Sequence, residues 1–349
     1  MSTPSPTLPV RWATTRLHIV TGKGGTGKTT VAAALALALA AEGKRVLLAE
    51  VEGRQGISQV LDVAPLGLEE TRLMGTLSGG EVVGLSVDAK AALLEYLQLF
   101  YKLGRAGGAL ERFGAIDFAT TIAPGVRDVL LIGKIYEANG RPSGGRAKNR
   151  GGPRAYDAIV LDAPPTGRVV RFLSVSSEVA GLARVGPIKS QAESIMRMLT
   201  SRQTLVHLVT LLEDMPVQET IDTIRDLDAV GLPVGAVIVN QVREDVLAPE
   251  GLDALERLVA DPGAVDREAV RASMTRAGIR VTGPMLDGLL REGADHAMRT
   301  RLAAEQWEVL AETGRPMLAL PTLVDGVDAN GVRELADWLG DLATAGAVR

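Results

Sequence analysis

The sequence contains no cysteine among its 349 residues. Disulfide bonds, thiolate zinc sites and iron–sulfur clusters held by the chain's own side chains are therefore excluded. The sequence also lacks any run of about 18 apolar residues, the length that a membrane-spanning helix requires. The first ten residues are polar and contain proline where a secretory signal has an apolar core. We therefore expect a cytoplasmic protein with no integral membrane span.

The chain has no strong excess of charge of either sign. It carries 38 Lys and Arg against 42 Asp and Glu, a formal net charge of −4. No overall basic field would attract nucleic acid, so no nucleic-acid partner is expected. The contents of 46% hydrophobic and 23% charged residues are typical of a globular protein, and we interpret residues 1–349 as a single domain.

A glycine-rich loop near the N-terminus carries the strongest functional signal. It comprises Gly22, Lys23, Gly24, Gly25, Thr26, Gly27, Lys28, Thr29 and Thr30. An apolar, β-branched run precedes this loop, and an alanine- and leucine-rich run follows it. Strand, loop and helix in this order form a phosphate-binding loop, whose backbone N–H groups surround the phosphates at a helix N-terminus. The pattern assigns Lys28 to the β- and γ-phosphates and the Thr29 hydroxyl to Mg²⁺, so we predict a site for ATP and Mg²⁺.

A second motif, Asp-Ala-Pro-Pro-Thr-Gly at 162–167, follows the apolar run 158–161. An aspartate at the end of a buried strand in a phosphate-loop protein holds Mg²⁺ or its bound water. Asp162 is therefore our second candidate metal ligand, next to Thr29. The other interpretation of Asp162, which is compatible with the first, is a cap on a helix that begins near Gly167.

Strand-like and helix-like segments alternate along the chain. We predict strands at 16–21, 45–51, 82–87, 157–161, 204–210, 234–240 and 316–320, and helices at 28–42, 216–230, 283–312 and 329–341. Most of the strand segments are continuously apolar, which indicates burial on both faces. The prediction is an α/β fold with a doubly wound, mostly parallel sheet, the fold of phosphate-loop nucleoside triphosphatases. The ligand is expected at the carboxyl ends of the strands.

The two motifs and the order of the elements resemble the ArsA family. This family includes the ATPase subunit of the arsenite pump and the ATPase that delivers tail-anchored membrane proteins. The resemblance rests on the loop at 22–30 and on the segment 162–173, and it covers most of the chain. It implies a dimeric ATPase in which Lys23 reaches the nucleotide of the facing subunit and stabilises transition-state charge, as an arginine finger does.

The resemblance also assigns a water-positioning carboxylate to the segment after the second strand. Glu52 stands where the family has aspartate, and Gly53 and Gln55 replace its usual proline and histidine. A glutamate can still accept a proton, but its carboxylate lies one methylene further from the backbone. Misplacement on this scale can cost about 10²-fold in rate, so we expect slow hydrolysis. The alternative interpretation makes Glu52 a solvated loop residue.

The resemblance further implies an adenine site at Asn240 and at the loop that begins with Pro321. An asparagine amide offers a donor and an acceptor to an adenine edge, although an asparagine that ends a strand is also a common turn former. Because the chain has no cysteine, the thiolate metalloid and zinc sites of family members are missing. A homodimer, or a heterodimer with a paralogue, must form through other contacts.

Two insertions, 88–138 and 176–202, look helical and form the predicted inserted helical subdomain. Six of the eight Tyr and Phe residues lie between 96 and 136. In the tail-anchor relatives such insertions form a groove for a hydrophobic client helix, whereas the plainer interpretation is that they pack on each other. Residues 138–154, with five basic residues and no acid, are predicted to form a flexible basic loop.

The sequence leaves more than one function open. The first is an ATP-dependent switch that presents a surface to a client, in membrane-protein targeting or in an anion-pump-like role. The alternatives are a regulatory or positioning ATPase that acts at a membrane or on DNA, and a phosphate-loop kinase or ligase for a small molecule.

Overall fold

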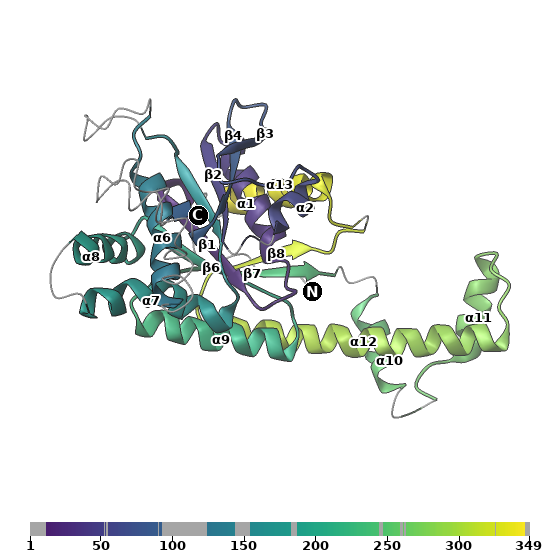
Figure 1. Cartoon of the computed structure of the whole chain (residues 1–349). Coiled ribbons are helices and arrows are strands. Elements are labelled where there is room, and N and C mark those ends of the chain that lie inside the picture. Colours follow the sequence, from purple (N-terminus) through teal and green to yellow (C-terminus); the bar gives the residue numbers. More distant parts are fainter. Residues whose placement is uncertain are drawn as a thin grey trace.

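The computed structural model describes residues 12–51, 53, 55–89, 91–92, 124–143, 154–182, 187–243, 247–258, 261, 263–324 and 326–345. These residues contain an eight-stranded sheet of strand order β3-β4-β2-β5-β1-β6-β7-β8 (Figure 1). The strands are β1 (Leu17–Gly22), β2 (Arg45–Val51), β3 (Thr71–Gly75), β4 (Glu81–Val87), β5 (Ala158–Asp162), β6 (Thr204–Thr210), β7 (Val234–Val242) and β8 (Met317–Pro321). Only the β3–β4 pair is antiparallel. The predicted mostly parallel α/β sheet is confirmed.

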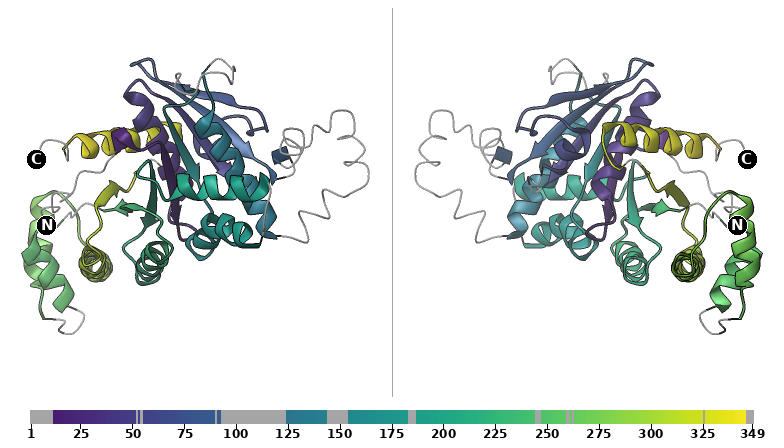
Figure 2. Two further views of the ribbon diagram at one scale, coloured as in Figure 1. Left: turned by 90° about the vertical axis from the view of Figure 1, so that its left-hand side faces the viewer. Right: turned by 90° about the vertical axis from the view of Figure 1, so that its right-hand side faces the viewer.

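Helices cover both faces of this sheet, as the side views in Figure 2 show. The helices of the described residues are η1 (Trp12–Thr14), α1 (Lys28–Ala41), α2 (Gly56–Leu61), α6 (Pro124–Gly140), α7 (Thr166–Leu182), α8 (Pro187–Leu199), α9 (Asp214–Ala229), α10 (Pro249–Arg257), α11 (Arg267–Arg276), α12 (Gly283–Ala311) and α13 (Ala329–Ala345). One core contains residues of α1, α2 and α13, and the other contains residues of α6, α7, α8 and α9. Ile19 and Val20 are both fully buried although they belong to opposite cores, which explains why the strands read as continuous apolar runs.

The alanine-rich helix α1 lies between the sheet and α13. Every residue from Thr30 to Ala40 is buried. Alanine side chains let a helix approach its neighbours closely on all sides, and a helix that is apolar around its whole circumference is one buried in a core. The alanine and leucine residues therefore both favour the helix and allow it to pack closely in the core. This packing fixes the position of the loop that precedes the helix.

Besides the short helix η1, four elements were not predicted from the sequence: β3, α2, α10 and α11. The last two contain no buried residue, and β3 is an edge strand that is mostly exposed. The sequences of β3, α10 and α11 therefore lack the long apolar period by which buried elements are recognised, and α2 is only six residues long. In Figure 1 the N-terminal part of α12 extends away from the sheet together with α10 and α11. Throughout the part of the chain that the structure describes, no helix is both long and apolar enough to cross a membrane.

The described parts of the two insertions pack together against the sheet. Ile132, Phe172 and Ile195, from α6, α7 and α8, are at most 1% exposed and share one core cluster. Helix α7 begins at Thr166, so the second insertion starts as a continuation of the helix after the Asp162 motif. Residues 93–123, the greater part of the first insertion, lie outside the described residues.

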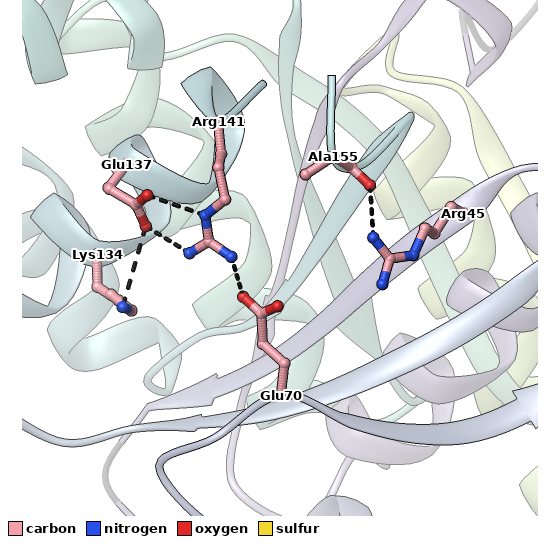
Figure 3. Close-up of polar contacts among 6 residues, drawn as sticks. All are labelled: Arg45, Glu70, Lys134, Glu137, Arg141 and Ala155. Atoms are coloured by element: carbon pink, nitrogen blue, oxygen red, sulfur yellow. Dashed lines mark hydrogen bonds and ion pairs between the residues drawn. The ribbon is translucent and has the colours of Figure 1, made fainter. Parts of the chain in front are cut away.

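The predicted basic loop is shorter at its start than 138–154. Helix α6 continues to Gly140, and Ala138 and Asn139 are buried, because this end of the helix packs on the sheet. Figure 3 shows how Arg141 is held. Its guanidinium pairs with Glu70 and with Glu137, the latter at 2.6 Å.

The chain returns beside Arg141 at the far end of the same loop. The Ala155 N–H donates to the Arg141 carbonyl oxygen at 2.9 Å, and the Arg45 Nη1 donates to the Ala155 carbonyl at 3.1 Å (Figure 3). The two ends of the predicted loop are thereby joined to each other and to β2. Residues 144–153 lie outside the described residues.

Two buried histidines stack in the core between β1 and β6. The rings of His18 and His207 are 5.4 Å apart and 13° from parallel. His207 Nδ1 accepts the Ala236 N–H at 3.2 Å, which requires a neutral ring with its proton on Nε2. That Nε2–H then donates to His18 Nδ1 at 3.1 Å. Burial lowers the pKa of His207 to about 4, and burial together with the neighbouring His207 lowers the pKa of His18 well below its usual range.

We therefore expect the free energy of unfolding to fall as the pH is lowered from 7.5 to 5. The unfolded chain binds protons at histidine below about pH 6.5, whereas the folded chain does not until lower pH, so acid favours unfolding. For His207 alone the loss over this range is about 2 kcal/mol. Urea unfolding at a series of pH values measures it.

A matched pair of variants isolates the effect. His207→Gln removes one of the two buried titrations and should make the decline smaller, while Asn330→Ala, at an exposed and non-titrating residue of α13, should leave it unchanged. An equal decline in the wild-type protein and in His207→Gln would show that other groups cause it.

Candidate functional site

The glycine-rich loop connects β1 to α1 at the carboxyl edge of the sheet. A Cβ atom at Gly22 would lie 2.1 Å from the Val209 carbonyl oxygen of β6, and one at Gly27 would lie 2.4 Å from the Asn240 Nδ2. Gly27 also has a φ of 86°, which favours glycine. Both positions therefore require glycine for the loop to adopt this path.

The loop ends at the N-terminus of α1. Gly27 is the N-cap residue, and it provides no side chain to satisfy the first N–H groups of the helix. Those N–H groups, together with the helix dipole, favour an anion at this end. Lys28 is the first residue of α1, so a cationic side chain starts from the same point.

Thr29 and Asp162 meet at this end of the helix. The Thr29 hydroxyl donates to Asp162 Oδ2 at 2.7 Å, from α1 to the end of β5. The two predicted metal ligands, which are 133 residues apart, thus lie side by side. Their hard oxygen atoms suit Mg²⁺, which is usually held by one or two protein oxygens with water and phosphate completing its shell.

Further contacts fix the Asp162 motif to the loop. The Thr21 hydroxyl, at the end of β1, donates to the Pro164 carbonyl at 2.7 Å. The Ala163 N–H donates to the Val20 carbonyl at 2.9 Å. The turn after β5 is thereby joined to the strand that leads into the phosphate-binding loop. A displacement of either segment would strain the hydrogen bonds to the other.

Asn240, near the end of β7, supports the loop from the other side. Its Nδ2 donates to the Thr26 carbonyl at 2.9 Å, and both residues are buried. Thr26 in turn donates through its hydroxyl to the Lys23 carbonyl at 2.9 Å. The amide donor is therefore used to shape the loop, which the sequence did not predict. Pro321 ends β8 and pairs with Val242 of β7, two residues beyond Asn240. The adenine roles of both residues stay predictions.

Lys23, the additional lysine of the loop, is ion-paired within the chain. Its Nζ lies 2.5 Å from Glu219 Oε1 on α9, and the side chain is 30% exposed. Glu219 Oε2 accepts the Thr166 hydroxyl at 2.8 Å. The hydrogen bond from Lys23 lowers the pKa of Glu219. No local sequence pattern indicates this contact, because 196 residues separate its partners.

A buried carboxylate that the sequence analysis missed lies at the end of β2. Glu50 is 2% exposed and is the register partner of Asp162 on the adjacent strand. It accepts the N–H groups of Gln55 (3.1 Å) and Ile57 (3.3 Å). The sequence signal for Glu50 was an acidic residue within the otherwise apolar run 46–51. A carboxylate buried in such a strand needs hydrogen-bond donors around it, which indicates a specific structural or functional role.

Glu52 lies outside the described residues, but the chain on both sides of it is held. Glu50, near the end of β2, holds the chain after Glu52 by accepting the N–H groups of Gln55 and Ile57. The Gln55 side-chain oxygen accepts the Leu66 N–H at 2.7 Å, and its Nε2 donates to the Leu66 carbonyl at 3.0 Å. Gln55, at the family's histidine position, therefore joins the described residues after Glu52 to Leu66.

Removal of the Asn240 amide tests its supporting role. Asn240→Ala should lower the free energy of unfolding by about 1–2 kcal/mol, because the buried Thr26 carbonyl loses its donor. It should also weaken binding of ATP and GTP by the same factor, since the amide shapes the part of the site that both nucleotides share. Thermal unfolding and calorimetric titration measure the two effects.

The control is Asn330→Ala, at an exposed asparagine of α13, which should change neither quantity. A loss of ATP affinity with GTP affinity retained would instead assign Asn240 to adenine recognition.

The comparisons with known proteins agree with this geometry. Residues 15–202 match the family model of the anion-transporting ATPases, ArsA. The chain is 50% identical over 331 residues to ATPase BagA of Mycobacterium tuberculosis, an alignment that covers 95% of this chain and 94% of the relative. It is 25% identical over 264 residues to ATPase GET3 of Kluyveromyces lactis, covering 66% of this chain and 73% of that protein. The matched segment includes both the phosphate-binding loop and the Asp162 motif, and the chain belongs to the ArsA family of anion-transporting ATPases.

Proposed function

We propose that this ATPase binds ATP with Mg²⁺ in the loop at 22–30 and acts as a dimeric switch in which Lys23 of each subunit completes the site of the other. The position of the Lys23 ammonium carries the proposal. It reaches Glu219 on α9 and is partly exposed, so a facing subunit has access to it. Lys28, in contrast, starts from the first turn of α1, at the anion-binding end of that helix.

Each residue of the site has one task in this proposal. The loop N–H groups and Lys28 bind the β- and γ-phosphates, and Thr29 with Asp162 would hold Mg²⁺, which neutralises phosphate charge when bound. Glu52 orients the attacking water, and Lys23 of the facing subunit stabilises the charge that develops as the γ-phosphoryl group leaves. Because Glu52 has one methylene more than the family's aspartate, we expect slow turnover.

The nucleotide state is coupled to a client surface through α7. This helix begins at Thr166, four residues after Asp162, and packs with α6 and α8 in one core. A movement of the turn at 163–165 would therefore shift the helical layer as a body. The client itself is proposed by class only, as an apolar helix or a membrane-protein partner, and the dimer is formed with a second copy or with a paralogue.

Lys28→Ala should abolish binding of magnesium-ATP, because the phosphate charge loses its closest cation. Isothermal calorimetry measures the affinity. Lys44→Ala is the matched control, since Lys44 pairs with Glu42 beyond the far end of α1, and it should bind ATP as the wild type does. If Lys28→Ala bound magnesium-ATP with the affinity of the wild type, the proposal that ATP binds in this loop would be wrong.

A mixture of two inactive variants tests whether Lys23 acts on the facing subunit. Lys23→Ala should bind ATP but not hydrolyse it, and Lys28→Ala should bind none. When the two are mixed, each mixed dimer has one complete site. In it, Lys28 comes from the Lys23→Ala subunit and Lys23 comes from the Lys28→Ala subunit. ATPase activity should return to about a quarter of the wild-type rate, as expected for random exchange of a symmetric dimer.

Sedimentation in magnesium-ATP establishes first that the wild-type dimer forms and exchanges. If it does and the mixture shows no recovery, Lys23 acts within its own subunit. If no dimer of this chain forms, the second subunit has to be a paralogue.

A further inference from the structure

Glu219 connects two parts of the nucleotide site that are distant in sequence. One carboxylate oxygen is 2.5 Å from the Lys23 ammonium, and the other accepts the Thr166 hydroxyl at 2.8 Å. Lys23 belongs to the phosphate-binding loop, and Thr166 is the first residue of α7. A single side chain thus holds the lysine proposed to act on the facing subunit and the end of the Asp162 motif.

The helix that carries Glu219 is firmly attached to the sheet. Val217 and Thr220, on either side of it, are each 1% exposed. The hydroxyl of Thr223 donates to the Glu219 carbonyl at 2.6 Å. The backbone at Glu219 is therefore fixed by packing that does not involve Lys23, and the carboxylate is held in place between Lys23 and Thr166.

The ion pair is weak enough to be reversible. The Lys23 and Glu219 side chains are 30% and 35% exposed, and ion pairs at such positions change an equilibrium by roughly two- to fivefold. A contact of this strength biases the position of Lys23 without preventing its release. The lowered pKa of Glu219, caused first by Lys23, keeps the carboxylate charged at neutral pH.

We infer that Glu219 is a positioning residue that retains Lys23 on its own subunit in the nucleotide-free state and releases it when the ATP-bound dimer forms. The inference rests on the proposed function, in which Lys23 acts across the dimer. Lys23 cannot pair with Glu219 and reach a facing nucleotide at the same time. The pair therefore stabilises the resting state, and its loss favours the ATP-bound dimer by the same factor.

The first experiment measures how well Lys23 is held, without nucleotide and without a dimer. Trace acetylation of amines, read out at Lys23 by mass spectrometry, should proceed roughly two- to fivefold faster in Glu219→Gln than in the wild type, because the amine loses its anionic partner. Glu213→Gln, an exposed glutamate at the start of the same helix, is the matched control and should leave the rate unchanged. An equal rate in Glu219→Gln and the wild type would overturn the inference.

The second experiment measures the dimer. In magnesium-ATP the dissociation constant of Glu219→Gln should be lower than that of the wild type by roughly four- to twenty-five-fold, because two ion pairs are broken per dimer. The affinity of the monomeric protein for ATP should not change, because Lys23 leaves Glu219 only when the dimer forms. A residue that served only to stabilise α9 would leave this constant unaltered or raise it.

The outcomes separate the two proposals. Faster acetylation with an unchanged dissociation constant would overturn the release of Lys23 as a control of dimer formation and leave the proposed function intact. Failure of the wild-type chain to form any dimer in magnesium-ATP would overturn the proposed homodimer, and with it the regulatory part of the inference, even if acetylation of Lys23 responds to Glu219.

Discussion

The hydrogen bond from the Thr29 hydroxyl to Asp162 is the contact on which the rest of the site depends. It exists because β1 and β5 are adjacent parallel strands, so that the loop after one and the turn after the other emerge at the same edge of the sheet. The link from Thr21 to Pro164 draws the two segments together further. This arrangement provides a helix N-terminus for phosphates and, in our proposal, a pair of oxygen ligands for Mg²⁺.

Carboxylates extend this contact in two directions. On one side Glu50, the register partner of Asp162, holds the chain around Glu52 by accepting the backbone N–H groups of Gln55 and Ile57. On the other side Glu219 holds Thr166 and Lys23. The segment proposed to position water is thus anchored to Glu50, beside Asp162 in the sheet. The lysine is anchored to Glu219, which also binds the end of the Asp162 motif. In the proposed function, a change at the phosphates would be passed to both segments through these short contacts.

The fold was largely predictable from the sequence, because its main strands and helices are buried and carry a clear apolar pattern. Strand β2 matched the predicted 45–51, and α13 was predicted four residues too short. Strand β3 and helices α10 and α11 were missed because exposed elements lack that pattern. In the site, the glycine spacing and the acidic end of β5 pointed to Thr29 and Asp162, the proposed metal ligands, which the structure places in contact. The ion pair of Lys23 with Glu219 and the amide of Asn240 on Thr26 depend on tertiary packing, which no local pattern reveals.

The most direct test of this account is the dependence of ATP affinity on Mg²⁺ in Asp162→Asn. Calorimetric titration with and without Mg²⁺ compares this variant with the wild type, and no turnover is needed for the measurement. If Thr29 and Asp162 together hold the ion, Mg²⁺ strengthens ATP binding in the wild type and no longer does so in the variant. An equal gain in both proteins would show that the ion binds elsewhere and would contradict the account.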